Sequence, residues 1–173
     1  MTFIKNYQQR VSPASTARQK LAEETVAISH SGTYINLQNN CVRLYAEIER
    51  CLQGTRLFTP SYHPTMPEAC HLSAGVDVVN ETTLQCAKRL VDQNFKRVGV
   101  LNFASAKNPG GGFLRGSQAQ EESLARSSAL YVSLQQCPEF YDYHRNKDRS
   151  LIYSNHVIYS PYCPVFRNDA GEL

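Results

Sequence analysis

The sequence predicts an α/β fold in which helices cover both faces of a mixed, mostly parallel sheet. Its 173 residues are 42% hydrophobic and 19% charged, which suits one domain spanning residues 1–173. Two short apolar runs, 75–79 and 97–103, predict buried strands. A helical pattern separates these runs, and strand–helix–strand connections favour parallel strands with helices packed on the sheet.

The N-terminal elements follow from spacing and from helix-end signals. A helix is expected over 13–31, because Ser12 can cap it, Pro13 suits its first position and Gly32 ends it. Further along the chain we expect strands over 33–37 and 41–44, a helix over 45–52, and an irregular, proline-containing loop over 59–71.

The central elements surround a glycine-rich connection. Asn80 is expected to cap a helix over 82–93, and the strand over 97–103 follows. A loop over 104–117 then leads into a long helix over 117–136. The last expected elements are a polar segment over 138–150 and short strands over 157–160 and 165–166.

Composition and charge argue against several classes of function. The net charge is +3 with scattered lysines and arginines, so direct DNA binding is not expected. The longest apolar run is shorter than the roughly 18 residues of a membrane span, and the N-terminus lacks a leader-like core. We therefore expect a cytoplasmic protein, or a nuclear one in a eukaryote. Six cysteines without a C-x-x-C pair predict reduced thiols and no metal site.

The chemistry is expected in the loop and helix that follow the strand over 97–103. Gly110, Gly111 and Gly112 leave the backbone bare, and such amides can form a concave site for an anion such as a diphosphate. The alternative is a flexible loop without a ligand. The spacing of Ser117 and Gln120 predicts a capping box at the start of the next helix.

Two carboxylates follow in the first turn of that helix. Glu121 and Glu122 can be simple partners of the helix dipole, or they can be catalytic. Consecutive helical residues point about 100° apart, so these two side chains cannot lie on opposite sides of a scissile glycosidic bond as the two carboxylates of a usual glycosidase do. If the site is catalytic, one carboxyl group transfers the proton and the other positions the ligand. The dipole lowers a carboxyl pKa whereas burial raises it, and the sequence leaves that balance open.

The order GGG, seven residues, QEE resembles the signature of poly(ADP-ribose) glycohydrolases. The flanking stretches LNFASAKNPGGGF and AQEESLARSSALY resemble the microbial-type branch of that family. The resemblance implies a macrodomain-like three-layer α/β/α sandwich that binds ADP-ribose. It also implies hydrolysis of ribose–ribose O-glycosidic bonds in poly(ADP-ribose), with release of ADP-ribose and without a metal or cofactor.

The resemblance also implies roles for individual residues. Glu122 matches the catalytic acid/base, and Glu121 and Gln120 match positions that orient the ligand. The three glycines match the loop that holds the diphosphate and the terminal ribose. The remaining candidate substrate contacts are Ser105, Asn108 and Phe113, the last as a wall of the pocket.

Length sets this chain apart from the family, whose members continue through further strands and a second phosphate-binding loop. We therefore expect a sheet that is incomplete at the C-terminus, with an uncovered edge that allows self-association. The implied partners are poly(ADP-ribose), ADP-ribose and poly(ADP-ribosyl)ated proteins, without a membrane. Two alternatives remain open, namely a non-catalytic ADP-ribose-binding module and an inactive truncated homologue.

Overall fold

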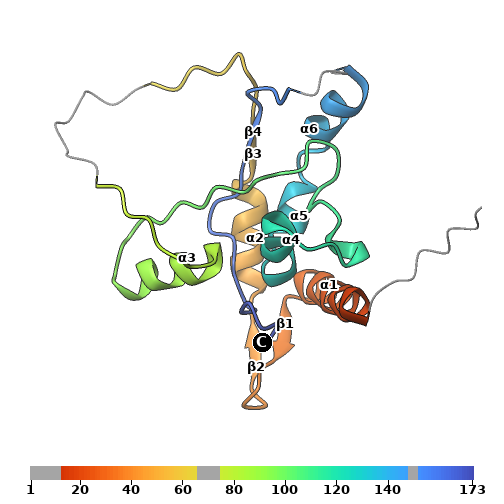
Figure 1. Ribbon diagram of the computed structural model, residues 1–173, viewed down its shortest axis with the longest axis vertical. Coiled ribbons are helices and arrows are strands. Elements are labelled where there is room, and N and C mark those ends of the chain that lie inside the picture. The colour runs from red at the N-terminus through yellow and green to blue at the C-terminus, as the bar shows by residue number, and fades with distance from the viewer. Residues whose placement is uncertain (1–12, 66–74, 148–151) are drawn as a thin grey trace, which may run out of the picture.

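The computed structural model describes residues 13–65, 75–147 and 152–173. It is an α/β arrangement of helices with small two-stranded sheets (Figure 1). In chain order the elements are α1 (Pro13–Ser31), β1 (Thr33–Ile35), β2 (Cys41–Arg43), α2 (Tyr45–Gly54), β3 (Arg56–Phe58), α3 (Thr83–Asp92), the 3₁₀ turn η1 (Phe113–Arg115), α4 (Gln120–Ser127), α5 (Leu130–Leu134), α6 (Pro138–Asp142), the π-helical turn η2 (Tyr143–Lys147) and β4 (Val157–Tyr159).

The first helix, the two strands and the second helix form where the sequence predicts them, with the strands shortened to 33–35 and 41–43, whereas the predicted Ser12 cap lies outside the described residues. Helix α1 begins at Pro13 and ends before Gly32, whose φ of +68° lets the chain reverse into the β1–β2 hairpin. The hairpin is antiparallel, with Thr33 opposite Arg43. Helix α2 follows directly, and its Ile48 and Cys51 are buried.

The predicted strands over 75–79 and 97–103 are wrong for this structure. Both segments are unpaired coil, and Val78 and Leu101 are 95% and 75% exposed. An apolar run becomes a strand only when a neighbouring strand accepts its backbone hydrogen bonds. Within the described ranges the paired strands are β1 with β2 and β3 with β4, both antiparallel, so a mostly parallel sheet is absent there.

Helix α3 forms where its periodicity predicts it, but with a different cap. Thr82, not Asn80, is the N-cap residue. Its hydroxyl accepts from the Gln85 amide at 3.1 Å, and the Gln85 side chain accepts from the Thr82 amide at 3.1 Å. This reciprocal capping box starts the helix two residues after the expected cap. None of the α3 side chains is buried, although the sequence predicts an apolar face.

The predicted long helix over 117–136 is broken into α4 and α5. Ser128 between them is extended, with φ −148° and ψ 174°. The C-terminal segment inserts its backbone there, because Phe166 donates to the Ser127 carbonyl at 2.9 Å and Ala129 donates to the Pro164 carbonyl at 3.1 Å. The expected strand over 165–166 is reduced to a bridge between Ser128 and Val165. These tertiary hydrogen bonds replace helical ones, which periodicity alone does not reveal.

Elements of the C-terminal half are partly as expected. The strand predicted over 157–160 is confirmed as β4, whereas its partner β3 was not predicted. Part of the polar segment over 138–150 is helical, as α6 and η2. The expected loop over 59–71 is irregular as far as residue 65, and its remainder lies outside the described residues.

The core lies among α1, α2, α4 and α5, which gather at the centre of Figure 1. Beneath the glycine-rich loop, Phe113 packs with Ala22 of α1 and Ala125 of α4, and its ring centroid lies 4.8 Å from that of Tyr131. This packing fixes α4 against α1 and so sets the position of the loop. Among the helices that the structure describes, none has the length and apolar character to cross a membrane.

Candidate active site

The glycine-rich loop turns sharply in front of α4. Gly110 and Gly111 have φ values of +67° and +61°, a region that side chains other than glycine rarely adopt. The Gly111 amide donates to the Asn108 carbonyl at 3.0 Å, and the Phe113 amide donates to the Gly110 carbonyl at 3.2 Å. A Cβ atom on Gly111 would collide with Glu122 Oε1 and lie 3.0 Å from Glu121 Oε2. The bare backbone therefore lies against both carboxylates.

Each carboxylate is held by the loop backbone. The Gly112 amide donates to Glu122 Oε1 at 2.9 Å, and the Ser105 amide donates to Glu121 Oε2 at 2.7 Å. The Asn102 side chain adds a longer hydrogen bond of 3.4 Å to Glu121 Oε1. The loop and the first turn of α4 are thus one hydrogen-bonded unit with two acidic groups at its centre.

The two glutamates differ in exposure. Glu121 is only 4% exposed, whereas Glu122 is partly exposed. Burial raises the pKa of the Glu121 carboxyl group above its ordinary value, and the Glu122 charge adds to the rise. Hydrogen bonds from Ser105, Asn102 and Gly110 oppose this rise without cancelling it. At Glu121, burial therefore outweighs the effects that stabilise the carboxylate.

Gln120 connects the first turn of α4 to the coil over 97–103. Its Oε1 accepts from the Phe103 amide at 2.9 Å, and its Nε2 donates to the Leu101 carbonyl at 2.8 Å. Nε2 also lies 3.3 Å from the Thr83 hydroxyl at the start of α3. One side-chain amide thus satisfies a backbone donor and a backbone acceptor, as a neighbouring strand would. Gln120 holds the preceding segment in place.

Helix α1 supports the end of the loop, a contact that sequence reasoning missed. Arg18 Nε donates to the Gly116 carbonyl at 2.6 Å, and Gln19 donates to the Arg115 carbonyl at 3.1 Å. From α4, Arg126 donates to the Ser117 carbonyl at 2.7 Å. Arg18 and Gln19 lie about 100 positions before the loop residues that they contact, so no local pattern could reveal the support from α1.

The other candidate residues lie around this loop in different environments. The Ser105 hydroxyl accepts from the Lys107 and Asn108 amides at 3.3 and 3.2 Å, so it closes a local turn. The Asn108 side chain is exposed. Phe113, expected to wall the pocket, is 1% exposed and lies in the core beneath the loop. Asn102 was not singled out, although a polar residue in an apolar run was a usable signal.

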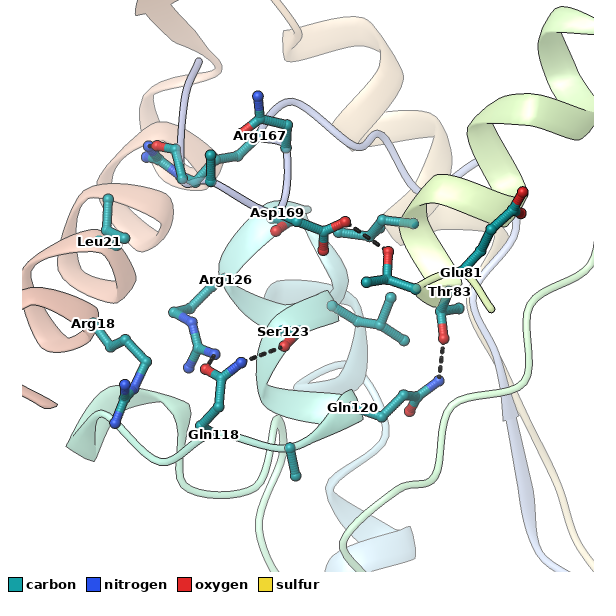
Figure 2. A pocket seen from close by; sticks show the side chains of 18 residues that line it. Arg18, Leu21, Glu81, Thr83, Gln118, Gln120, Ser123, Arg126, Arg167 and Asp169 are labelled. Carbon is teal, nitrogen blue, oxygen red and sulfur yellow. Dashed lines mark hydrogen bonds between the residues drawn. The ribbon is translucent and has the colours of Figure 1, made fainter. Parts of the chain in front are cut away.

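A cavity of about 780 Å³ lies on the other face of α4 (Figure 2). Gln120, Ser123 and Ser127 line it, whereas Glu121, Glu122 and Ala125 face the glycines, about half a turn away around the helix. Figure 2 shows Arg18, Arg126 and Arg167 lining this cavity from α1, α4 and the C-terminal segment.

Charged groups in this cavity have partners within the chain. Arg167 pairs with Glu24 at 2.8 Å, Glu81 pairs with Arg89 at 2.9 Å, and Asp169 accepts from Thr82 at 2.6 Å. Glu121 and Glu122 lie outside this cavity, whose own carboxylates, Glu81 and Asp169, are paired with Arg89 and Thr82. Within the described ranges, no group of three or more His, Cys, Asp and Glu side chains is arranged to hold a metal ion.

The comparison with protein families matches residues 22–168 to the catalytic domain of microbial-type poly(ADP-ribose) glycohydrolase (PARG). This match covers the loop, α4 and all the core helices except the first turns of α1. Among curated proteins, none matches the chain.

Solved structures agree with the family match. A PARG from Thermomonospora curvata is 42% identical, with a TM-score of 0.82 over 91% of this chain and 59% of that chain. The same organism's enzyme bound to the inhibitor ADP-HPD gives 42% identity, a TM-score of 0.81 and coverages of 91% and 58%. A PARG from Deinococcus radiodurans in complex with ADP-ribose is 43% identical, with a TM-score of 0.59 and coverages of 76% and 54%. The chain thus spans somewhat more than half the length of these proteins.

Proposed function

Because the chain belongs to the family of microbial-type PARG catalytic domains, we propose that it hydrolyses ribose–ribose O-glycosidic bonds in poly(ADP-ribose) and releases ADP-ribose. The observation that carries this proposal is the convergence of Glu121 and Glu122 on Gly111. A carboxyl group beside a bare backbone suits a substrate that has both a diphosphate and an acid-labile glycosidic bond. The related PARG structures with ADP-ribose and ADP-HPD support a ligand of this class.

Glu122 is the proposed acid/base. Its Oε1 is held by the Gly112 amide, which leaves Oε2 as the oxygen that exchanges a proton with the substrate. In the proposed step, the carboxyl group transfers a proton to the oxygen of the leaving ribose while the other ribose becomes oxocarbenium-like. The resulting carboxylate then takes a proton from the attacking water, which returns Glu122 to its starting state. Partial exposure of the Glu122 side chain lets the substrate approach it from solvent.

Glu121 is the proposed orienting group. Its Oε2 accepts from the Ser105 amide and its Oε1 from Asn102, so the carboxyl group is fixed within the loop. A buried carboxyl with a raised pKa holds its proton more readily and can then donate a hydrogen bond to a ribose hydroxyl. Gln120 acts indirectly in this scheme, because it holds the coil that carries Asn102.

The glycine loop is the proposed contact for the terminal ribose and the diphosphate, with Ser105 and Asn108 beside it. Binding an anion here requires an exchange of partners, since the Gly111, Gly112 and Phe113 amides already donate within the chain. Of these three, the Gly112 amide donates to a carboxylate instead of a carbonyl. If a phosphate oxygen accepts the hydrogen bond from the Gly112 amide, Glu122 Oε1 loses that bond. Binding of the diphosphate would then free the Glu122 carboxyl group from the loop.

We also propose that the fold is a macrodomain-like three-layer α/β/α sandwich and that residues 1–173 belong to one domain. Support comes from the exposed apolar residues of the two coil segments, which have the composition of buried strands. They are Val76, Val78, Val79, Val100, Leu101 and Phe103. We propose that the chain self-associates through these exposed residues. Substrates would include poly(ADP-ribose) attached to modified proteins.

Release of free ADP-ribose from purified polymer tests the proposed activity. The unsubstituted chain should produce ADP-ribose, and Glu122→Gln should lower the rate by about 10²–10⁴-fold. Glu47→Gln, an exposed glutamate in the first turn of α2, is the matched control and should keep the full rate. Turnover that survives in Glu122→Gln would contradict the assigned acid/base. Calorimetric binding of ADP-ribose without any release by the unsubstituted chain would instead select the binding-module alternative.

A further inference from the structure

The π-helical turn η2, which follows α6, contacts the backbone of the glycine-rich loop. Arg145 lies in this turn, and its Nε donates to the Lys107 carbonyl at 2.7 Å. Its guanidinium group also lies 3.5 Å from the Asp142 carboxylate, and Cζ is 6.0 Å from the centroid of the Tyr141 ring. The loop is therefore held by η2 in addition to the support from α1.

The peptide unit between Lys107 and Asn108 is held at both of its polar atoms. Arg145 binds its carbonyl oxygen, and the Ser105 hydroxyl accepts from its N–H group, the Asn108 amide, at 3.2 Å. The backbone amide of the same Ser105 donates to Glu121 Oε2 at 2.7 Å. A continuous series of hydrogen bonds thus leads from the Arg145 guanidinium, through this peptide unit and Ser105, to the buried carboxyl group.

The residue before Arg145 anchors η2 in the fold. His144 is 4% exposed, and its Nδ1 lies 2.7 Å from the Phe140 carbonyl oxygen, an acceptor that requires a proton on Nδ1. In the neutral ring, Nε2 then accepts from the Ser154 hydroxyl at 2.7 Å, and the Ser154 oxygen accepts from His156 Nδ1 at 2.7 Å. These bonds fix η2 to α6 and to the segment before β4, and so determine where the Arg145 side chain starts.

We propose that Arg145 is a positioning residue for the acidic pair and that His144 holds Arg145 in place. The inference rests on the proposed hydrolysis, since it gives Arg145 a part in that reaction through Ser105 and Glu121. By binding the Lys107 carbonyl, Arg145 keeps the Ser105 turn closed and the Ser105 amide directed at the Glu121 carboxyl group. π-helical turns are rare and are often found at functional sites, which agrees with this role.

Loss of the Arg145 hydrogen bond should act on the Glu121 carboxyl group. Burial raises the pKa of this group, and the hydrogen bond from the Ser105 amide opposes the rise. A loosened turn weakens that hydrogen bond, so the Glu121 pKa should rise further. Because the Arg145 side chain is 44% exposed, its replacement removes little buried contact and should leave the fold intact.

Two substitutions of Arg145 separate the hydrogen bond from the length of the side chain. Glutamine carries an N–H group at the chain position of the arginine Nε, whereas methionine has a methyl group there. Arg145→Met should raise the Glu121 pKa and speed hydrogen exchange at the Asn108 amide. It should also lower the rate of ADP-ribose release by about 2- to 30-fold. Arg145→Gln retains the donor and should return all three quantities towards their original values.

NMR of isotope-labelled carboxyl carbons measures the Glu121 pKa directly, with the signal assigned by its absence in Glu121→Gln. Arg56→Met is the matched control, because Arg56 is also exposed and also donates to backbone carbonyls, those of Gln53 and Thr55 at the end of α2. It should leave the Glu121 pKa, the Asn108 exchange rate and the release of ADP-ribose unchanged.

The role of His144 is tested by His144→Phe, which keeps an aromatic ring beside Phe140 but loses both hydrogen bonds. If His144 acts through Arg145, this variant should change the Glu121 pKa in the same direction as Arg145→Met. The double variant should then change it no further, since both substitutions remove the same contact. Additive changes would contradict the role assigned to His144.

Three results would overturn the role of Arg145. The first is an unchanged Glu121 pKa and unchanged Asn108 exchange in Arg145→Met. The second is an equal effect of Arg145→Gln, because the retained N–H group would then make no difference. The third is a raised pKa without any loss of rate in a chain that hydrolyses the polymer. The first two are read without substrate, so a chain that releases no ADP-ribose would contradict the proposed hydrolysis while the link from Arg145 to Glu121 is still tested.

Discussion

Gly112 donates its amide to Glu122 Oε1 across 2.9 Å, and this bond joins the glycine loop to the catalytic candidate on α4. Glu122 is the third residue of the helix, a position from which a glutamate often bonds back to the N-cap amide. Here its carboxylate turns to the loop instead. The helix start and the loop therefore depend on each other, and a change in one should disturb the other.

Gly111→Ala should damage both stability and activity. The left-handed backbone at +61° alone costs a non-glycine residue about 1–2 kcal/mol. The new methyl group would also displace the Glu122 carboxylate, and a misplaced catalytic group typically lowers the rate by about 10²-fold. Urea unfolding and ADP-ribose release measure the two effects. Gly99→Ala is the matched control, because its Cβ meets nothing within 4 Å, and it should leave both quantities near their original values.

Thr82→Ala should weaken α3. The substitution removes the capping hydroxyl that accepts from Gln85 and donates to Asp169, and loss of such a cap costs about 1 kcal/mol. Hydrogen exchange at the Gln85 and Cys86 amides should accelerate, while exchange in the α1 core should change little. Thr82→Ser keeps the hydroxyl and should restore protection. Equal acceleration in the serine variant would show that the methyl group, and not the cap, stabilises this helix end.

Helix-end and glycine signals predicted the structure well where neighbouring residues alone determine the backbone conformation. Helix α1 ends before Gly32 as expected, and Gly110 and Gly111 adopt positive φ angles, whereas Gly112 has a φ of −104°. The resemblance in GGG-x7-QEE agrees with the family match over residues 22–168. Short-range chemistry decides these features, so one sequence was enough to predict them.

The errors arose where distant segments compete with local preferences. Ser117 and Gln120 have capping-box spacing, but Ala119 is the N-cap and Gln120 bonds to Leu101 and Phe103 instead. The helix over 117–136 breaks at Ser128 because the C-terminal segment supplies other partners. The support of the loop by Arg18 depends on a contact across the core. None of these contacts has a signature within its own stretch of sequence.

Glu121 should make the stability of the protein fall as the pH rises. Its native pKa is raised, chiefly by burial, so the folded state keeps a proton that the unfolded chain releases near pH 4.5. The stabilisation is fully present below that pH and is lost as the pH rises through the native pKa. Glu121→Gln should flatten this dependence in urea unfolding measured between about pH 4 and pH 8. Glu47→Gln should retain the original slope, and an unchanged slope in Glu121→Gln would contradict the assignment.

Gln120→Ala should release the coil over 97–103 from α4. The variant loses the acceptor for the Phe103 amide and the donor to the Leu101 carbonyl, two hydrogen bonds worth about 1 kcal/mol each. Amide exchange at Phe103 should therefore accelerate. The rate of ADP-ribose release should fall as well, because Asn102 lies between the two bonded positions and contacts Glu121. Gln38→Ala, at an exposed turn between β1 and β2, should change neither readout. If Phe103 exchanges faster while release is unaffected, Gln120 holds the coil without positioning the acidic pair, and its proposed part in orienting the substrate is wrong.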